Sequence, residues 1–291
     1  MKDDDEGLSV ADLSFVCDLV YKEAAIVLDD TKSYLIEARL EPLARREGFD
    51  SIRDLVESLR TAKSPSLVSK AIDAMTTNET SFFRDIHPFV SLRKHILPEI
   101  IGRKSGEKRI SIWCAACSSG QEPYTISLLL KEYFPELRDW DVSILATDIS
   151  DEMLTRCRKG VFSKLEVNRG LPAPLLIKYF LQEEAEWRLK DEIRSLIEFR
   201  QLNLIAPFPL MARMDIVFIR NVLIYFDIKT KKEILEKIRR NMDPEGYMFL
   251  GGAETTLNID DEFHRLRIGK STCYTLREKD LVEAVETSAS A

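Results

Sequence analysis

The stretch RISIWCAACSSGQEP, residues 109–123, predicts the beginning of a parallel α/β sheet. An apolar strand pattern over residues 109–113 leads into small residues, and a helical pattern then runs over 122–134. Small side chains at this point let a ligand approach the backbone, and the N-terminus of the following helix favours negatively charged groups. The stretch therefore predicts a βαβ unit with a ligand site where its first strand ends.

Short apolar strands and helices continue to alternate after this stretch. A strand over residues 142–147 ends in Asp148, and a helix begins at Ser150. This alternation predicts a doubly wound α/β domain. A helix near 174–180 and a charged hairpin stretch at 183–194 predict a small β insertion near residues 181–196. The remaining predicted elements are strands at 197–201, 215–219, 247–250 and 272–276, and a helix at 229–241 ended by a turn at 243–246.

The chain before this domain has a different pattern. Apolar residues recur at helical spacing from Val10 to Met75, with no strand alternation. Asp50 and Ser51 resemble a helix cap, and Ser64, Pro65 and Ser66 form a break before a further helix. We expect an all-α domain over residues 1–75, an α/β domain over 76–277 and a flexible tail over 278–291.

Composition excludes several classes of protein. The 291 residues are 45% hydrophobic, with eleven glycines and eleven prolines, so the bulk of the chain is not disordered. No apolar run approaches the ~20 residues of a membrane helix, and the acidic start is unlike a signal peptide. A net charge of −7 disfavours nucleic acid as a partner. The five scattered cysteines predict reduced thiols without metal-ligand spacing, and we expect a cytoplasmic protein.

Asp148 supports an adenosine-containing ligand. In doubly wound folds an acid at the end of the second strand hydrogen-bonds ribose, and Asp148 lies 28 residues after Gly120. The alternative is a structural turn in which Asp148 caps a helix. A second alternative is a thiol redox site, because Cys114 and Cys117 have thioredoxin-type spacing after a strand; the competing interpretation is two small buried side chains.

Two further segments carry candidate functional side chains. Residues 76–85, TTNETSFFRD, combine hydroxyls, an amide and an arginine; the structural alternative is a capped linker whose Phe82 and Phe83 dock in the core. The apolar strand at 216–219 runs directly into Arg220 and Asn221, at the strand end where such sheets bind ligands. Here the alternative is an ion pair between Arg220 and Asp227, with Tyr225 in the core.

Together these segments carry a specific resemblance. From about residue 10 to 276 the chain resembles the chemotaxis receptor glutamate methyltransferases of the CheR type, which use S-adenosylmethionine. Six blocks match in the family's order: TNETSFFR at 77–84, AACSSGQEPY at 115–124, ATDI at 146–149, NL at 203–204, RNVLIYFD at 220–227 and GGAE at 251–254.

The resemblance implies a role for individual residues. Arg84 and Tyr225 are expected beside the transferred methyl group as catalytic residues. S-adenosylhomocysteine is the implied product, and no metal is implied. The residues implied in cofactor binding are Asn78, Thr80, Arg84, Glu122, Asp148, Asn203, Leu204, Arg220 and Asn221.

The family's substrates are glutamates on long helices of methyl-accepting chemotaxis receptors, which the helical domain helps to recognise. Basic side chains outnumber acidic ones over residues 31–72, so the resemblance assigns receptor recognition to Arg39, Arg45, Arg46 and Arg53; the alternative is a solvated charged face. The insertion near Glu183 lacks the glycine-containing loop of family members that dock a receptor pentapeptide, so we expect direct binding to the receptor helices without tethering.

Three other functions remain open from the sequence. They are a methyltransferase acting on another substrate, a non-catalytic S-adenosylmethionine-binding adaptor, and the thiol oxidoreductase. An adaptor would retain Asp148 without needing Arg84 or Tyr225, whereas both catalytic candidates are present.

Overall fold

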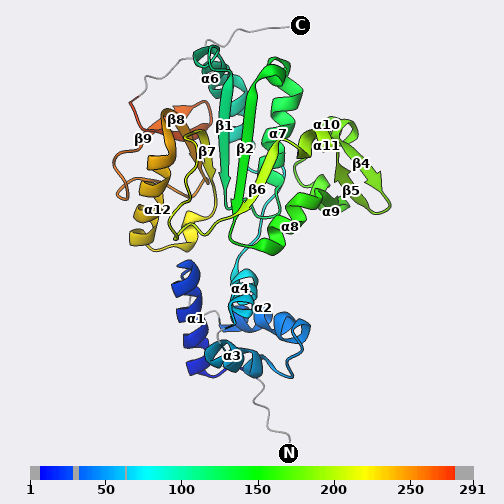
Figure 1. Ribbon diagram of the computed structural model, residues 1–291, viewed down its shortest axis with the longest axis vertical. Helices are drawn as coiled ribbons and strands as arrows, with labels where there is room; N and C mark the ends of the chain where they lie inside the picture. Colours follow the sequence, from blue (N-terminus) through cyan, green and yellow to red (C-terminus); the bar gives the residue numbers. More distant parts are fainter. Residues whose placement is uncertain (1–6, 29–32, 63, 279–291) are drawn as a thin grey trace, which may run out of the picture.

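A computed structural model describes residues 7–28, 33–62 and 64–278, and it consists of a small helical unit joined to a larger α/β unit (Figure 1). The predicted tail lies outside the described residues from 279 onward. Within the described ranges, no helix combines the length and the apolar character needed to cross a membrane.

The helical unit contains the predicted all-α fold. Its N-terminal caps follow from the sequence: the Ser9 side chain accepts from the backbone of Asp12 in a capping box, and Ser51 accepts from Asp54. Val16, Leu40 and the other buried residues of this unit form an apolar core of their own. The helices are α1 (Val10–Ala24), α2 (Ser33–Arg46), α3 (Ile52–Thr61) and α4 (Pro65–Met75).

The α/β unit is built on a seven-stranded sheet of order β6-β2-β1-β7-β8-β10-β9, which confirms the doubly wound prediction. Helices α5 (His87–Ser91), η2 (Leu92–Ile96) and α6 (Leu97–Arg103) lead into it. The strands are β1 (Arg109–Ala115), β2 (Asp141–Asp148), β6 (Ile197–Gln201), β7 (Met214–Ile219), β8 (Met242–Leu250), β9 (His264–Ile268) and β10 (Ser271–Thr275). Its other helices are α7 (Gln121–Tyr133), η3 (Pro135–Asp139), α8 (Asp151–Lys159), η4 (Leu223–Tyr225) and α12 (Ile228–Asn241).

The sheet is buried on both faces, which explains its continuous apolar strands. Cys114 of β1 belongs to the same core cluster as Ile126 of α7, whereas Trp113 belongs to the cluster of Ile234 in α12. Parallel pairing aligns Ala115 of β1 with Thr147 of β2 and with Ile219 of β7. The loops that follow these three strands therefore emerge at one edge of the sheet, the edge that faces the helical unit (Figure 1).

The insertion forms a separate small sheet of order β3-β5-β4. The predicted hairpin is confirmed, and β3 is an additional strand that the sequence pattern did not indicate. Phe82 packs edge-on against Phe162 at 5.0 Å and Phe180 at 5.9 Å between ring centroids, so the insertion contacts the segment that joins the two units. The elements are β3 (Val161–Ser163), α9 (Lys164–Asn168), α10 (Ala173–Tyr179), β4 (Phe180–Glu183), β5 (Glu186–Leu189) and α11 (Asp191–Arg194).

At the end of the sheet one prediction was wrong and one strand was missed. β8 begins at Met242 and includes the expected turn at 243–246, because the turn is accommodated as a register shift between Met214 and Ile216 of β7. A Cβ on Gly246 would lie 2.9 Å from the Asp243 carbonyl oxygen, so this irregularity requires glycine. The edge strand β9 was missed because only Leu266 of its five side chains is buried, which leaves little apolar alternation.

Candidate functional site

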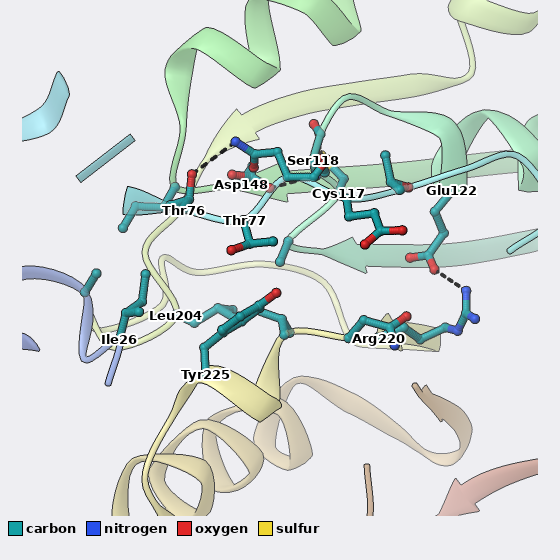
Figure 2. A pocket seen from close by; sticks show the side chains of 18 of the residues that line it. Ile26, Thr76, Thr77, Cys117, Ser118, Glu122, Asp148, Leu204, Arg220 and Tyr225 are labelled. Atoms are coloured by element: carbon teal, nitrogen blue, oxygen red, sulfur yellow. Dashed lines mark hydrogen bonds and ion pairs between the residues drawn. The ribbon is translucent and has the colours of Figure 1, made fainter. Parts of the chain in front are cut away.

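A cavity opens between the carboxyl edge of the sheet and the helical unit, and together with the solvent-open space at its mouth it measures about 990 Å³ (Figure 2). The ends of α1 and α4, the 76–84 segment and the loops after β1, β2, β6 and β7 form its walls. Every residue predicted for cofactor binding or catalysis lines this one cavity: Asn78, Thr80, Arg84, Glu122, Asp148, Asn203, Leu204, Arg220, Asn221 and Tyr225.

Asp148 anchors the loop that follows β1. Its two carboxylate oxygens accept from the backbone N–H of Ser118 at 2.7 Å and of Ser150 at 2.9 Å. Ser150, not Asp148, is the side chain that caps α8, so the capping alternative was wrong. Burial raises the pKa of Asp148, although its backbone hydrogen bonds oppose the rise. Each oxygen retains a lone pair for a further donor, such as a ribose hydroxyl.

Gly120 allows the loop and α7 to pack closely. Its φ of 95° lies in the left-handed region, and an added Cβ would lie 2.9 Å from the sulfur of Cys157. A single glycine at this position therefore satisfies both the turn and the close packing that the sequence pattern indicated.

A charge cluster around the buried Arg220 closes the opposite end of the cavity. The Arg220 guanidinium, whose side chain is 2% exposed, pairs with Glu122 at 2.8 Å and with Asp85 at 2.8 Å, and it donates to the Arg84 carbonyl at 3.0 Å. Burial raises the pKa of Glu122, and the nearby Arg220 opposes the rise. The Nε of Arg220 is buried without a hydrogen-bond partner in the described part of the chain, so the contacts of this guanidinium within the protein are incomplete.

The structural alternative, an ion pair between Arg220 and Asp227, was wrong. Asp227 instead caps α12 by accepting from the Thr230 N–H, and it accepts from the Tyr21 hydroxyl at 2.7 Å. Its neighbour Tyr225 is half-buried and extends into the cavity, not into the core (Figure 2).

Arg84 is held next to the cavity by the joining segment. Its Nη1 donates to the Glu79 carbonyl at 2.7 Å. Phe82 and Phe83 dock in the core as the structural alternative predicted, so the segment serves as a packed linker and as a cavity wall at once. The remaining guanidinium donors of Arg84 are left for a ligand.

Glu254 holds the loop that carries Asn221 and Tyr225. Its carboxylate accepts from the backbone N–H groups of Gly251 at 2.6 Å, Asn221 at 2.7 Å and Ile224 at 3.3 Å. An added Cβ on Gly251 would lie 2.6 Å from Asn221 Nδ2, so the approach requires glycine. This geometry gives the GGAE block a positioning role that its sequence alone did not indicate.

Sequence analysis missed the contribution of the helical unit to the cavity. Ala24, Ile26 and Met75 line it together with Thr76 and Thr77. Two backbone contacts hold the end of α1 there: the Val27 N–H donates to the Tyr225 carbonyl at 2.9 Å, and Asn203 Nδ2 donates to the Glu23 carbonyl at 2.7 Å. No local pattern marks these residues, because only tertiary packing brings them to the strand ends.

The four arginines predicted for receptor recognition all have partners within the chain. Arg39 donates to the Met75 carbonyl at 2.6 Å and to Thr77 at 3.0 Å, and Arg53 donates to the Gly7 carbonyl at 2.8 Å. Arg45 pairs with Glu41, and Arg46 lies 3.8 Å from both Glu47 and Glu152. Arg45 and Arg46 remain largely exposed, whereas Arg39 and Arg53 are tied to backbone carbonyls.

The cysteine geometry does not favour thiol chemistry. Cys114 and Cys117 are free, fully buried thiols, and burial raises the pKa of Cys114. Contact with the Cys157 thiol, followed by burial, raises the pKa of Cys117. Reactive cysteines need a lowered pKa and access to solvent, so the packing interpretation fits better. Over the described ranges, no group of histidine, cysteine and carboxylate side chains is arranged to hold a metal ion.

Comparison with known proteins is consistent with this geometry. Residues 11–76 match the model for the "CheR methyltransferase, all-alpha domain" and residues 78–271 match the "CheR methyltransferase, SAM binding domain". The chain is 40% identical over 258 residues to chemotaxis protein methyltransferase 1 of Pseudomonas aeruginosa, covering 87% of this chain and 93% of the relative. It is 38% identical to chemotaxis protein methyltransferase Cher2 of Pseudomonas putida, covering 92% and 99%. The chain therefore belongs to the CheR family of S-adenosylmethionine-dependent chemotaxis methyltransferases.

Proposed function

We propose that the protein transfers the methyl group of S-adenosylmethionine to glutamate side chains on the cytoplasmic helices of chemoreceptors, forming methyl esters in chemotaxis adaptation. The observation that carries this proposal is the convergence of Arg84, Tyr225, Asp148 and the Glu122–Arg220 pair on one cavity. An adaptor that only binds the cofactor would need neither Arg84 nor Tyr225 there.

The side chains of the cavity fit an adenosyl amino acid. Asp148 offers acceptors for ribose hydroxyls, and Leu204 and Ile149 offer apolar walls for an adenine ring. Glu122 can accept from an ammonium group, and the Arg220 guanidinium paired with it supplies the positive charge that favours a carboxylate nearby. We assign the remaining lining residues Asn78, Thr80, Asn203 and Asn221 to the same ligand.

The residues of the site position and desolvate the reactants. When bound, S-adenosylmethionine supplies an electrophilic methyl group on a sulfonium sulfur. A glutamate side chain has an ordinary pKa of about 4.3 and is already ionised at neutral pH, so the protein needs no general base. Arg84 holds one oxygen of the substrate carboxylate by a charge-assisted bond, leaving the other to attack, and the Tyr225 hydroxyl donates beside it.

Water exclusion adds to this positioning. Ile26 from the helical unit and Leu204 from the α/β unit close the cavity with apolar surface (Figure 2). Removing water strips the substrate carboxylate of hydration that would slow its attack, while Arg84 replaces part of that stabilisation with a fixed charge.

The hairpin supports binding to the receptor without a pentapeptide tether. β4 and β5 are joined only by Glu184 and Ala185, with Glu183 paired to Glu186, so the hairpin turn is short and contains no glycine. We propose that the enzyme engages the helices of its receptor directly.

The test is to incubate the protein with S-adenosylmethionine carrying a labelled methyl group and with receptor cytoplasmic fragments. Methyl esters of glutamate release the label in mild base, so base-labile label on the fragment is the expected result. Calorimetry should show binding of S-adenosylhomocysteine. Absence of binding would refute the proposal, and binding without label on any fragment would favour the adaptor.

A further inference from the structure

We propose that an exposed patch beside Tyr225 binds the amphipathic, acidic receptor helix that carries the target glutamate. This inference rests on the proposed function and adds to it the surface that receives the substrate. The patch, here called the junction patch, consists of Tyr21, Val27, Ile224, Ile228, Lys229 and Lys232.

Four large apolar side chains are exposed at this junction. Tyr21 is 48% exposed, Val27 54%, Ile224 50% and Ile228 69%. Two hydrogen bonds bring their segments together: the Tyr21 hydroxyl donates to Asp227, and the Val27 N–H donates to the Tyr225 carbonyl. Figure 1 shows the end of α1 next to the start of α12, which is where these contacts occur. Clustered exposed apolar side chains of this kind mark interaction surfaces more often than scattered ones do.

The junction patch borders the mouth of the cavity. Val27 directly follows Ile26, and Ile224 directly precedes Tyr225; both of these neighbours line the cavity. A helix lying on the patch would therefore pass beside Tyr225, within reach of a side chain pointing into the site. The patch spans both units, so a bound helix would contact each of them.

The charges around the patch favour an acidic partner. Lys229, Lys231 and Lys232 lie at the start of α12, whose first turn contains no acidic residue. Cations are unfavourable at a helix N-terminus because the helix dipole is positive there, so these lysines are not placed for the stability of α12. Across the described ranges their ammonium groups have no ion pair and no hydrogen bond.

Acidic groups among the described residues offset only part of this charge. Asp227 is occupied by the Tyr21 hydroxyl and the Thr230 N–H, Glu23 lies 3.5 Å from Lys22, and Glu236 pairs with Arg240. On the two helices beside the patch, the exposed acids without an ion pair in the described ranges are Asp18 on α1 and Glu233 on α12, and Asp29 and Asp30 lie outside those ranges. The arginines of α2 and α3 contrast with these lysines, because each of them already has a partner within the chain. Apolar side chains edged by cations match a helix with an apolar stripe and acidic flanks.

The experiment measures KM for a receptor cytoplasmic fragment at saturating S-adenosylmethionine. We expect the double reversal Lys229→Glu and Lys232→Glu to raise KM at least tenfold and to weaken its salt dependence, and Ile228→Ser to raise KM several-fold. Turnover at saturating fragment and the affinity for S-adenosylhomocysteine should stay within twofold, because none of these residues lines the cavity. The unchanged affinity also shows that the variants are folded.

Matched controls carry the same changes elsewhere. Lys108 precedes β1 at the opposite end of the sheet, and Lys270 lies in the β9–β10 turn; their double reversal changes net charge equally. Ile177 in α10 is 77% exposed and serves as the control for Ile228. A KM within twofold of wild type for the Lys229 and Lys232 variant overturns the proposal, as does an equal rise in the Lys108 and Lys270 control. Failure of the wild-type protein to label any fragment refutes the proposed function instead.

Discussion

Replacing Glu254 with glutamine tests whether the loop that carries Tyr225 is held by charge. The substitution keeps the size of the side chain and removes its charge. Two short bonds, from Gly251 N–H at 2.6 Å and Asn221 N–H at 2.7 Å, converge on one oxygen of Glu254. The third bond, from the Ile224 N–H at 3.3 Å, reaches the other oxygen. In one of the two orientations of a glutamine amide, the NH2 group would occupy this position and could not accept the bond.

The size of the effect follows from these bonds. A hydrogen bond to a charged group contributes about 1 kcal/mol more than a neutral one, so the two short bonds together lose about 2 kcal/mol. If the whole of this roughly 2 kcal/mol is lost from the free energy that holds the loop in its active position, kcat/KM falls roughly 30-fold. We expect kcat/KM of the Glu254→Gln variant to be roughly 10- to 30-fold lower than that of the wild type. We expect a similar loss for Glu254→Asp, because the shorter side chain does not span three N–H groups.

The assay is steady-state methylation of a receptor fragment, with Tm measured alongside. Glu262 is the matched control, because its one ion pair within the described ranges, with Arg239, spans 4.0 Å and its side chain is 70% exposed; Glu262→Gln should leave kcat/KM unchanged. Activity of Glu254→Gln within twofold of wild type would show that the loop does not depend on this carboxylate.

Three further outcomes are expected. Arg84→Ala should lower turnover far more than cofactor affinity and Asp148→Ala should do the reverse, measured by kinetics and calorimetry; equal losses of affinity would contradict these separate roles. Burial raises the pKa of Asp73 from 3.8 to about 6, so its protonated form stabilises the fold at low pH and this contribution is lost as pH rises through 6. Asp73→Asn should therefore remove a pH dependence of about 1 kcal/mol from denaturant unfolding, after allowance for partial exposure. Phe82→Ala should cost about 3 to 5 kcal/mol of stability in the same assay, whereas exposed Ile86→Ala should cost little.

Periodicity and topology explain the successful predictions. The strands near Ile112, Ile144 and Val217 are buried on both faces, so each appears as a continuous apolar run. Since parallel strands end at one edge, Asp148 and Arg220 could be placed at the same edge of the sheet because each follows a predicted strand. The 76–85 segment belongs to no strand end, and its place in the site came from family resemblance.

The ion-pair partners of buried charged side chains could not be predicted from the sequence in this way. For Arg220 the sequence suggested Asp227, seven positions along the chain, whereas its partners Glu122 and Asp85 lie 98 and 135 positions away. A buried guanidinium takes whichever carboxylates the fold presents, and local spacing carries no information about them. The same holds for Ile26, whose position beside Tyr225 depends on where α1 ends against the sheet.

The cavity is completed only where the two units meet. The match to the all-alpha domain family ends at residue 76, and the match to the SAM binding domain family begins at residue 78. Ala24, Ile26 and Met75 of the first unit nevertheless line the cavity together with residues of the second. By thermodynamic linkage, if docking of the two units strengthens the binding of a ligand, binding of that ligand strengthens the docking of the two units by the same free energy. We therefore expect cofactor binding also to stabilise the surface on which we place the receptor helix, since the Val27 N–H of the junction patch donates to the Tyr225 carbonyl.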